Sequence, residues 1–162
     1  MARIRPAEES DLPVITDIYN QAVLRTTATF DTEPRTVEAR RPWFLSHDDN
    51  HPILVEEDGG AVRGWASLSR YSERAAYSRT VEISVYVSEE WRGRGIGRKL
   101  VAALVAEGRR IGHHAVLALI TADNSVSVRL HESFGFFMVG TMREVGVKFG
   151  RALDVHVMEL LI

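Results

Sequence analysis

The segment VEISVYVSEEWRGRGIGRKLVAALV, residues 81–105, restricts the possible folds more than any other part of the chain. Its opening stretch, VEISVYVS, alternates between apolar and polar side chains, which is the period of a β-strand. A glycine-rich turn follows, and the apolar residues after it recur at helical spacing. The segment therefore predicts a strand, a tight turn and a helix that pack against the same sheet.

The alternation predicts which side chains share a face. Successive residues of a strand point to opposite sides, so one face carries Glu82, Ser84 and Tyr86. The other face is apolar, with Val81, Ile83, Val85 and Val87. The predicted helix has Ile96, Leu100, Leu104 and Ile111 on one side, which fastens the turn to the core.

The remaining chain predicts a mixed α/β protein. Similar patterns indicate strands over 2–7, 52–57, 62–69, 80–88, 115–121, 136–148 and 152–161, and helices over 11–24, 35–46, 95–111 and 124–133. The run AVLALIT, residues 115–121, is continuously apolar, as expected for a strand covered on both faces. No linker or repeat interrupts the pattern, so we expect one domain over 1–162, a sheet with helices on both faces.

Composition excludes several classes of function. The net charge is −2 and the pI is about 6.3, which gives no bulk attraction to nucleic acid. There is no cysteine, hence no disulfide, thiolate zinc site or cysteine nucleophile. The longest apolar run, residues 100–106, is far too short to cross a membrane, and MARIRPAEESD lacks the apolar core of a signal peptide. We expect a cytoplasmic protein.

The basic residues around the glycine turn indicate an anion site. A helix N-terminus carries about +0.5 of an elementary charge, so cations there are destabilising unless something negative binds. Here Arg92, Arg94, Arg98 and Lys99 gather at that end. Neither the Rossmann fingerprint nor the Walker loop fits, because Arg98 and Ile96 stand where each requires glycine. A phosphate or pyrophosphate site is favoured over the alternative, a plain turn with exposed arginines.

These residues resemble the GNAT N-acetyltransferases. RGRGIG, residues 92–97, matches their acyl-CoA loop, and NSVSVRLHESFGF, residues 124–136, resembles their second signature. TTATFDTEP, AYSRTVEISVYVS and RLHESFGF further resemble the phosphinothricin and methionine sulfoximine or sulfone N-acetyltransferase branch. The resemblance implies the GNAT fold, with a mixed, mostly antiparallel, twisted sheet.

The resemblance also implies acetyl-CoA as cosubstrate. Backbone N–H groups of the loop would hold its pyrophosphate, and the strand would meet the thioester and pantetheine at Val85 and Val87. The implied cofactor-binding residues are Val85, Tyr86, Val87, Arg92, Gly93, Arg94, Gly95, Ile96, Gly97, Arg98, Asn124 and Ser133.

Glu82 is the candidate general base. A carboxylate within an apolar strand is, by its residues alone, more often an edge or solvent-facing glutamate. The branch resemblance reverses that interpretation, because the branch places its proposed base at this position. Glu82 would take the proton from the acceptor amine directly or through a water molecule, and the sequence leaves both routes open.

His131 is a second catalytic candidate. Many members of the superfamily have a tyrosine at this position, proposed as the acid for the leaving thiolate. An imidazole titrates in a suitable range, but a structural histidine, or a thiolate that needs no acid, fits as well.

The acceptor side is predicted from the loop RYSERAAYSR, residues 70–79. Arginine suits bidentate capture of a carboxylate, whereas a solvated charged loop is the alternative. By resemblance the substrate-contacting residues are Phe30, Arg74, Ala75, Ala76 and Tyr77, and the substrates are small amino acids with a tetrahedral sulfur or phosphorus group.

Rival functions and partners follow from the same residues. A GNAT enzyme acting on a protein N-terminus or another amine is one alternative, and a non-catalytic CoA-binding module is the other. Neither HExxH nor GxSxG occurs, so we expect no metal site and no hydrolase elbow. We expect no nucleic-acid or membrane partner, and the resemblance implies a homodimer.

Overall fold

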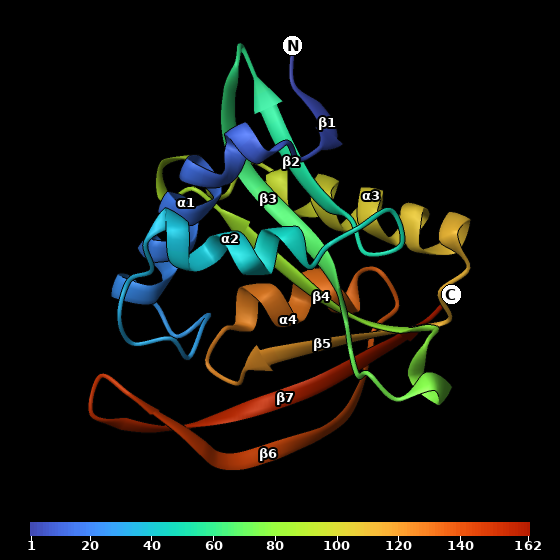
Figure 1. The fold of residues 1–162 in the computed structure, drawn as a ribbon. Helices are drawn as coiled ribbons and strands as arrows, with labels where there is room; N and C mark the ends of the chain where they lie inside the picture. Colours follow the sequence, from blue (N-terminus) through green and yellow to red (C-terminus); the bar gives the residue numbers. More distant parts are fainter.

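The computed structural model describes residues 1–162. Seven strands form one mixed sheet in the order β1-β2-β3-β4-β5-β7-β6 (Figure 1). Only β4 and β5 run parallel, and every other neighbouring pair is antiparallel. The strands are β1 Arg3–Pro6, β2 Ile53–Asp58, β3 Ala61–Arg70, β4 Thr80–Val87, β5 Ala115–Thr121, β6 Phe137–Lys148 and β7 Arg151–Leu161.

Helices cover both faces of this sheet. The helices are α1 Leu12–Arg25 and α2 Val37–Leu45 on one face, and α3 Ile96–Ile111 and α4 Ser125–Glu132 on the other (Figure 1). Short 3-10 turns lie at Glu9–Asp11, Ala75–Tyr77 and Glu89–Trp91. None of the helices combines the length and apolar character needed to cross a lipid bilayer.

The alternation of β4 separates two hydrophobic cores. Val81 and Ile83 are buried in the core beneath α3, as the strand pattern predicts. Tyr86 points the other way and packs with Trp65 of β3 against the core beneath α1. The side chain of Glu82 therefore lies on the α1 and α2 face of the sheet.

The predicted mixed, mostly antiparallel sheet with helices on both faces is confirmed. The prediction that the strand at residues 115–121, now β5, is covered on both faces is wrong, however. Val116, Ala118 and Ile120 are buried, but Leu119 on the opposite face is 46% exposed. Since α1 packs on β3 and β4 and α2 packs mainly on α1, they leave that face of β5 open.

The sheet divides between β4 and β5. β4 pairs with β3 from Val81 to Val87, whereas its pairing with β5 ends at Glu82 and Leu117. Beyond this point the two parallel strands separate, so one side of β4 from Ile83 onward has no strand partner. This opening positions the candidate site.

Candidate active site

A cavity of about 840 Å³ lies in the opening beside β4. It is bounded by the end of β4, the N-terminal turn of α3, the N-terminus of α4 and the loop that follows α1. The predicted cofactor residues that line it are Val85, Tyr86, Val87, Arg92, Gly93, Gly95, Ile96, Gly97, Arg98 and Asn124. The structure therefore brings together one strand and two helix N-termini around a single space.

The glycine turn leaves the first turn of α3 open to a ligand. Gly93 and Gly95 have φ angles of +74° and +79°, a left-handed conformation that favours glycine. No side chain caps the N-terminus of α3, whereas Asn124 caps α4 and Thr36 caps α2. The N–H groups at the start of α3 are thus available to an anion.

The arginines of this turn are not neutralised within the chain. None of Arg92, Arg94 and Arg98 forms an ion pair. Arg92 donates from Nε to the carbonyl of Val87 at 3.2 Å, and Arg94 stacks 4.7 Å from the centre of the Trp91 ring. Arg94 is not among the residues that line the cavity. The uncompensated positive charge and the open helix end together suit a pyrophosphate.

Glu82 lies where β4 and β5 separate. Its register partners are Ser69 of β3 and Leu117 of β5. The carboxylate is partly buried and forms no hydrogen bond or ion pair, and burial alone raises the pKa of Glu82 above its usual value. A carboxylate of this kind is a better proton acceptor than a solvated one. Glu82 itself is not a lining residue of the cavity.

The loop between α1 and α2, residues 26–36, closes one side of the site. Side chains from three strands hold its successive carbonyl groups: Thr27 by Thr121 of β5 at 2.5 Å, Ala28 by Tyr86 of β4 at 3.4 Å, and Thr29 by Lys148 of β6 at 2.8 Å. Because the donors come from separate strands, the loop is fixed relative to the whole sheet.

Phe30 lies within this fixed loop and packs onto β6. A Cβ atom built on Gly146 would fall 2.2 Å from Cε2 of Phe30, so the ring occupies space that only glycine leaves free. Lys148, which holds the neighbouring carbonyl of Thr29, is only 4% exposed, and burial lowers the pKa of its ammonium group. The structure thus fixes Phe30 through residues of β6.

The predicted acceptor loop is only partly free to bind a ligand. Arg79 donates to the carbonyl of Gly112 at the end of α3, at 2.8 Å, and Arg70 pairs with Glu73 at 3.6 Å. Arg74 is exposed and forms no ion pair, so its guanidinium group is uncommitted. The neighbouring candidates are Ala75, Ala76 and Tyr77, which form the 3-10 turn, where the Tyr77 ring packs edge-on against Tyr71 at 5.1 Å. None of these residues lines the cavity.

The predicted residues of α4 have different surroundings. The Oδ1 atom of Asn124 accepts a hydrogen bond from the N–H of Ser127 at 3.2 Å, so its amide group is oriented beside the cavity. Ser133 donates to the carbonyl of Leu130 at the far end of the helix and is not a lining residue.

His131 also lies outside the cavity lining. Its ring is buried against Phe136, and Nδ1 donates to the carbonyl of Ser127 at 2.8 Å. Burial lowers the pKa of His131, which favours the neutral ring. This arrangement fits a structural histidine as well as an acid, so the catalytic role of His131 stays a prediction.

Sequence reasoning missed much of the wall opposite β4. The missed lining residues include Thr26, Thr27, Ala28, Trp91, Ser127, Leu130, Phe149 and Arg151. Trp91 and Leu130 had a signal, since each lies within or beside a predicted motif. Thr27 also lies within a quoted motif, TTATFDTEP, whereas Phe149 and Arg151 had no such signal, because they lie outside every predicted motif. No group of three or more histidine, aspartate or glutamate side chains is arranged to hold a metal ion.

Comparison with known proteins agrees with this geometry. Residues 15–136 match the Acetyltransferase (GNAT) family. The chain is 42% identical to an L-methionine sulfoximine/L-methionine sulfone acetyltransferase of Salmonella typhimurium, over 97% of this chain and 92% of the relative. It is 45% identical to a phosphinothricin N-acetyltransferase of Streptomyces coelicolor, over 94% of this chain and 92% of the relative.

The fold matches solved structures equally well. A GNAT superfamily phosphinothricin acetyltransferase from Sinorhizobium meliloti, in complex with acetyl-CoA, superimposes with a TM-score of 0.95 at 36% identity. The match covers 99% of this chain and 88% of that one. The family match, the two relatives and the shared fold agree with the open helix end beside a divided sheet, and the chain therefore belongs to the GNAT family of acetyltransferases.

Proposed function

We propose that this enzyme transfers an acetyl group from acetyl-CoA to the α-amine of a small amino acid such as phosphinothricin, methionine sulfoximine or methionine sulfone. The observation that carries the proposal is the opening between β4 and β5. It has an uncapped, positively charged helix N-terminus beside it and the partly buried Glu82 at its closed end. The names of the relatives support this class of acceptor.

The cofactor would lie along β4. The N–H groups from Arg92 to Arg98 would hold the pyrophosphate, and the free arginines would add attraction to the phosphates. The pantetheine would pass the unpaired side of Val85 and Val87, with the Val85 N–H meeting the thioester carbonyl. Asn124 lines the same cavity as these residues, and Ser133 would contact the cofactor further along α4.

Glu82 would act as the general base. An unperturbed glutamate with a pKa of about 4.3 facing an α-ammonium near 8 leaves a gap of about 3.7 units, or about 5 kcal/mol. Burial raises the pKa of Glu82 and narrows this gap. The free amine would then attack the thioester carbonyl directly, and the thiolate would leave either unaided or with a proton from His131.

The acceptor would bind between the loop at residues 26–36 and the loop at residues 70–79. Phe30 would form an apolar wall, and the uncommitted guanidinium of Arg74 would pair with the carboxylate of the acceptor. Ala75, Ala76 and Tyr77 would complete this side.

The first test replaces Glu82 with glutamine, which keeps the shape and removes the base. We expect the rate to fall on the order of 10²–10⁴-fold at pH 7, to recover partly at high pH, and acetyl-CoA affinity to stay unchanged. A rate within a few-fold of wild type would show that another group removes the proton.

The second test concerns the acceptor. Thiol release would be followed with methionine sulfone, its carboxamide analogue and a peptide with a free N-terminus. We expect the carboxamide to lose about tenfold or more in kcat/KM. Equal kcat/KM for the acid and the carboxamide would refute the pairing of Arg74 with the acceptor carboxylate. A higher kcat/KM for the peptide would favour a protein N-terminus as the acceptor.

We also propose that two copies of the chain form a homodimer through β6. This edge strand is twelve residues long, and its exposed apolar side chains include Phe137, Met138, Val139, Met142, Val145 and Val147. Long apolar edges are normally covered. Sedimentation of wild type and a Val145→Lys, Val147→Lys variant tests this proposal, and a monomeric wild type would contradict it.

A further inference from the structure

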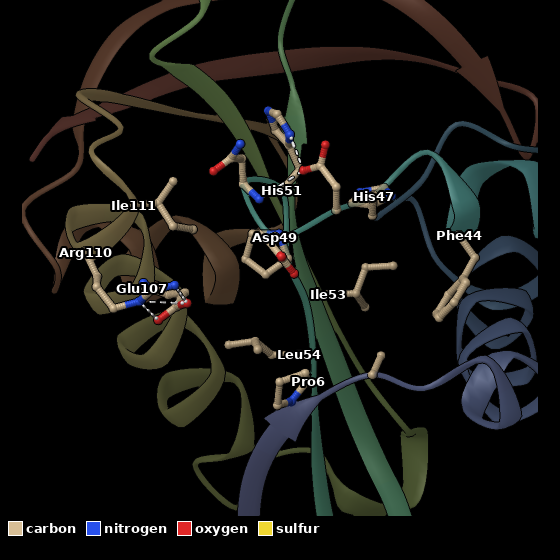
Figure 2. Close-up of a pocket in the computed structure, with 14 residues that line it drawn as sticks. Pro6, Phe44, His47, Asp49, His51, Ile53, Leu54, Glu107, Arg110 and Ile111 are labelled. Atoms are coloured by element: carbon tan, nitrogen blue, oxygen red, sulfur yellow. Dashed lines mark hydrogen bonds and ion pairs between the residues drawn. The ribbon is translucent and has the colours of Figure 1, made fainter.

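A second cleft lies on the side of the molecule occupied by the end of α2. It has a volume of about 710 Å³ and lies between the segment that follows α2, the start of β2 and the C-terminal turn of α3 (Figure 2). His47 lies at its border, beside the end of α2 (Figure 2). This histidine connects the cleft with the face of the sheet that carries Glu82.

The hydrogen bonds of His47 define its tautomer. Nδ1 lies 2.7 Å from the carbonyl of Trp43, which can only accept, so Nδ1 carries the proton. Nε2 lies 2.9 Å from Oγ of Ser69 and must accept from that hydroxyl group. The neutral ring thus presents a lone pair to Ser69, a residue of β3.

Ser69 stands directly opposite Glu82 in the pairing of β3 with β4. Directly opposed residues share one face of the sheet, with Cβ atoms about 4.5–5.5 Å apart. Ser69, whose hydroxyl contacts His47, is therefore the neighbour of Glu82 on this face, and a relay requires the protonated Glu82 to form a hydrogen bond to Oγ of Ser69. Sequence reasoning assigned no role to either Ser69 or His47.

The reaction requires an exit for protons. An acceptor ammonium and acetyl-CoA yield the amide, the thiol of CoA and one proton, so each turnover releases one proton to solvent. If Glu82 takes this proton while acetyl-CoA and the acceptor fill the opening, the direct route to water is covered. The proton then has to leave Glu82 before the next cycle.

We propose that Ser69 and His47 relay this proton from Glu82 to the second cleft. The protonated Glu82 gives its proton to Oγ of Ser69, while Ser69 gives its own to Nε2 of His47. The resulting imidazolium loses its Nδ1 proton to water in the cleft, and transfer of the remaining ring proton from Nε2 to Nδ1 through water restores the starting tautomer. Ser69 and His47 act through Glu82, so this inference rests on the proposed function.

The surroundings of His47 favour rapid release. Burial lowers the pKa of His47 most and the nearby Arg40 lowers it further, while the hydrogen bond to the Trp43 carbonyl and the nearby Asp48 raise it. The edge-on ring of Trp43, 4.9 Å away, fixes the imidazole plane. An imidazolium formed here is short-lived, as a relay requires.

The test is a chemical rescue of the multiple-turnover rate, because the relay acts between one cycle and the next. His47→Ala should lower the rate of acetyl transfer about tenfold or more, and added imidazoles should enter the open cleft and restore it. A relay requires that the restored rate depend on the pKa of the added imidazole. A restored rate that does not depend on the pKa of the imidazole, or a His47→Ala rate within twofold of wild type, would overturn the proposal.

Control variants separate the relay from the fold and from the base. His51→Ala changes another histidine of the same cleft, paired with Asp48, and should leave the rate unchanged. Should His47→Ala fail to fold, His47→Gln keeps hydrogen-bonding capacity without titration and should show the same loss. In a Glu82→Gln background, His47→Ala should cost nothing further. A fully active Glu82→Gln enzyme would refute the base itself, whereas an impaired one beside an intact His47→Ala would refute the relay alone.

Discussion

Gly146→Ala should displace Phe30 and so weaken use of the acceptor. The added Cβ would lie 2.2 Å from Cε2 of Phe30, whereas carbon atoms pack at about 3.5–4.0 Å, so the ring has to move by about 1.5 Å. Phe30 is 38% exposed and is able to move outward. Stability should therefore change little, by about 1 kcal/mol at most.

The cost should appear in catalysis. Misplacement of a positioning group by about 1 Å costs up to about 10²-fold. We expect kcat/KM for the amino acid to fall about tenfold, equivalent to about 1.4 kcal/mol, with KM for acetyl-CoA unchanged. Gly140→Ala is the matched control on the same strand, because a Cβ there meets nothing within 4 Å.

A double-mutant cycle with Phe30→Ala gives the decisive measurement. If Gly146 acts only by making room for Phe30, then Gly146→Ala should have no further effect once the ring is gone. Thiol release with varied acceptor concentration supplies the constants. Additive losses in kcat/KM would refute the reasoning and would place the effect of Gly146 elsewhere.

Three further predictions concern the cofactor, the candidate acid and the response to pH. Gly95→Val forces a φ of +79° onto a β-branched residue, and we expect calorimetry to show acetyl-CoA binding weakened about tenfold. The control, Gly112→Ala at φ +101° at the other end of α3, should lower stability alone. Unchanged affinity in a folded Gly95→Val variant would refute the loop assignment. His131→Phe should keep its rate within a few-fold of wild type, and a hundredfold loss would assign the acid role to His131. Arg5 donates to both oxygens of Asp11 at 2.7 and 2.9 Å and lowers the Asp11 pKa below 3.8, so this stabilisation is present above that pH and is lost as pH falls through the lowered value. Arg5→Met should therefore cost about 2 kcal/mol in urea unfolding at pH 7, and a gap from wild type that persists in strong acid would contradict the pairing.

The sequence predicted the fold well because its signals are local. Alternation over VEISVYVS and the glycine turn each depend on residues close together in the chain. The exposure of Leu119 was not predictable in this way. An apolar run does not indicate which of its two faces a helix will cover.

The walls of the site were less predictable, because they depend on distant contacts. Lys148 and Thr29 are 119 positions apart, and His47 and Ser69 are 22 apart. A buried lysine or a serine in a strand gives no sequence signal until the topology is known. The buried Arg40 is a similar case, since its guanidinium lies 3.8 Å from the Trp43 ring centre without a carboxylate partner.

The alternation of the β4 side chains between the two faces of the sheet links the core, the candidate site and His47. The odd-numbered residues of β4, from Val81 to Val87, pack against α3 and face the glycine turn. The even-numbered residues face α1, α2 and the α1–α2 loop. A shift of the strand by one residue would exchange the two sets, moving Glu82 into the α3 core and a valine to Ser69. The strand pairing with β3 is continuous from Val81 to Val87, and this register holds Glu82 on the side of Ser69 and His47. The same register leaves Val85 and Val87 at the separated edge beside β5. In the proposed mechanism, proton removal and thioester binding thus depend on opposite faces and edges of one strand.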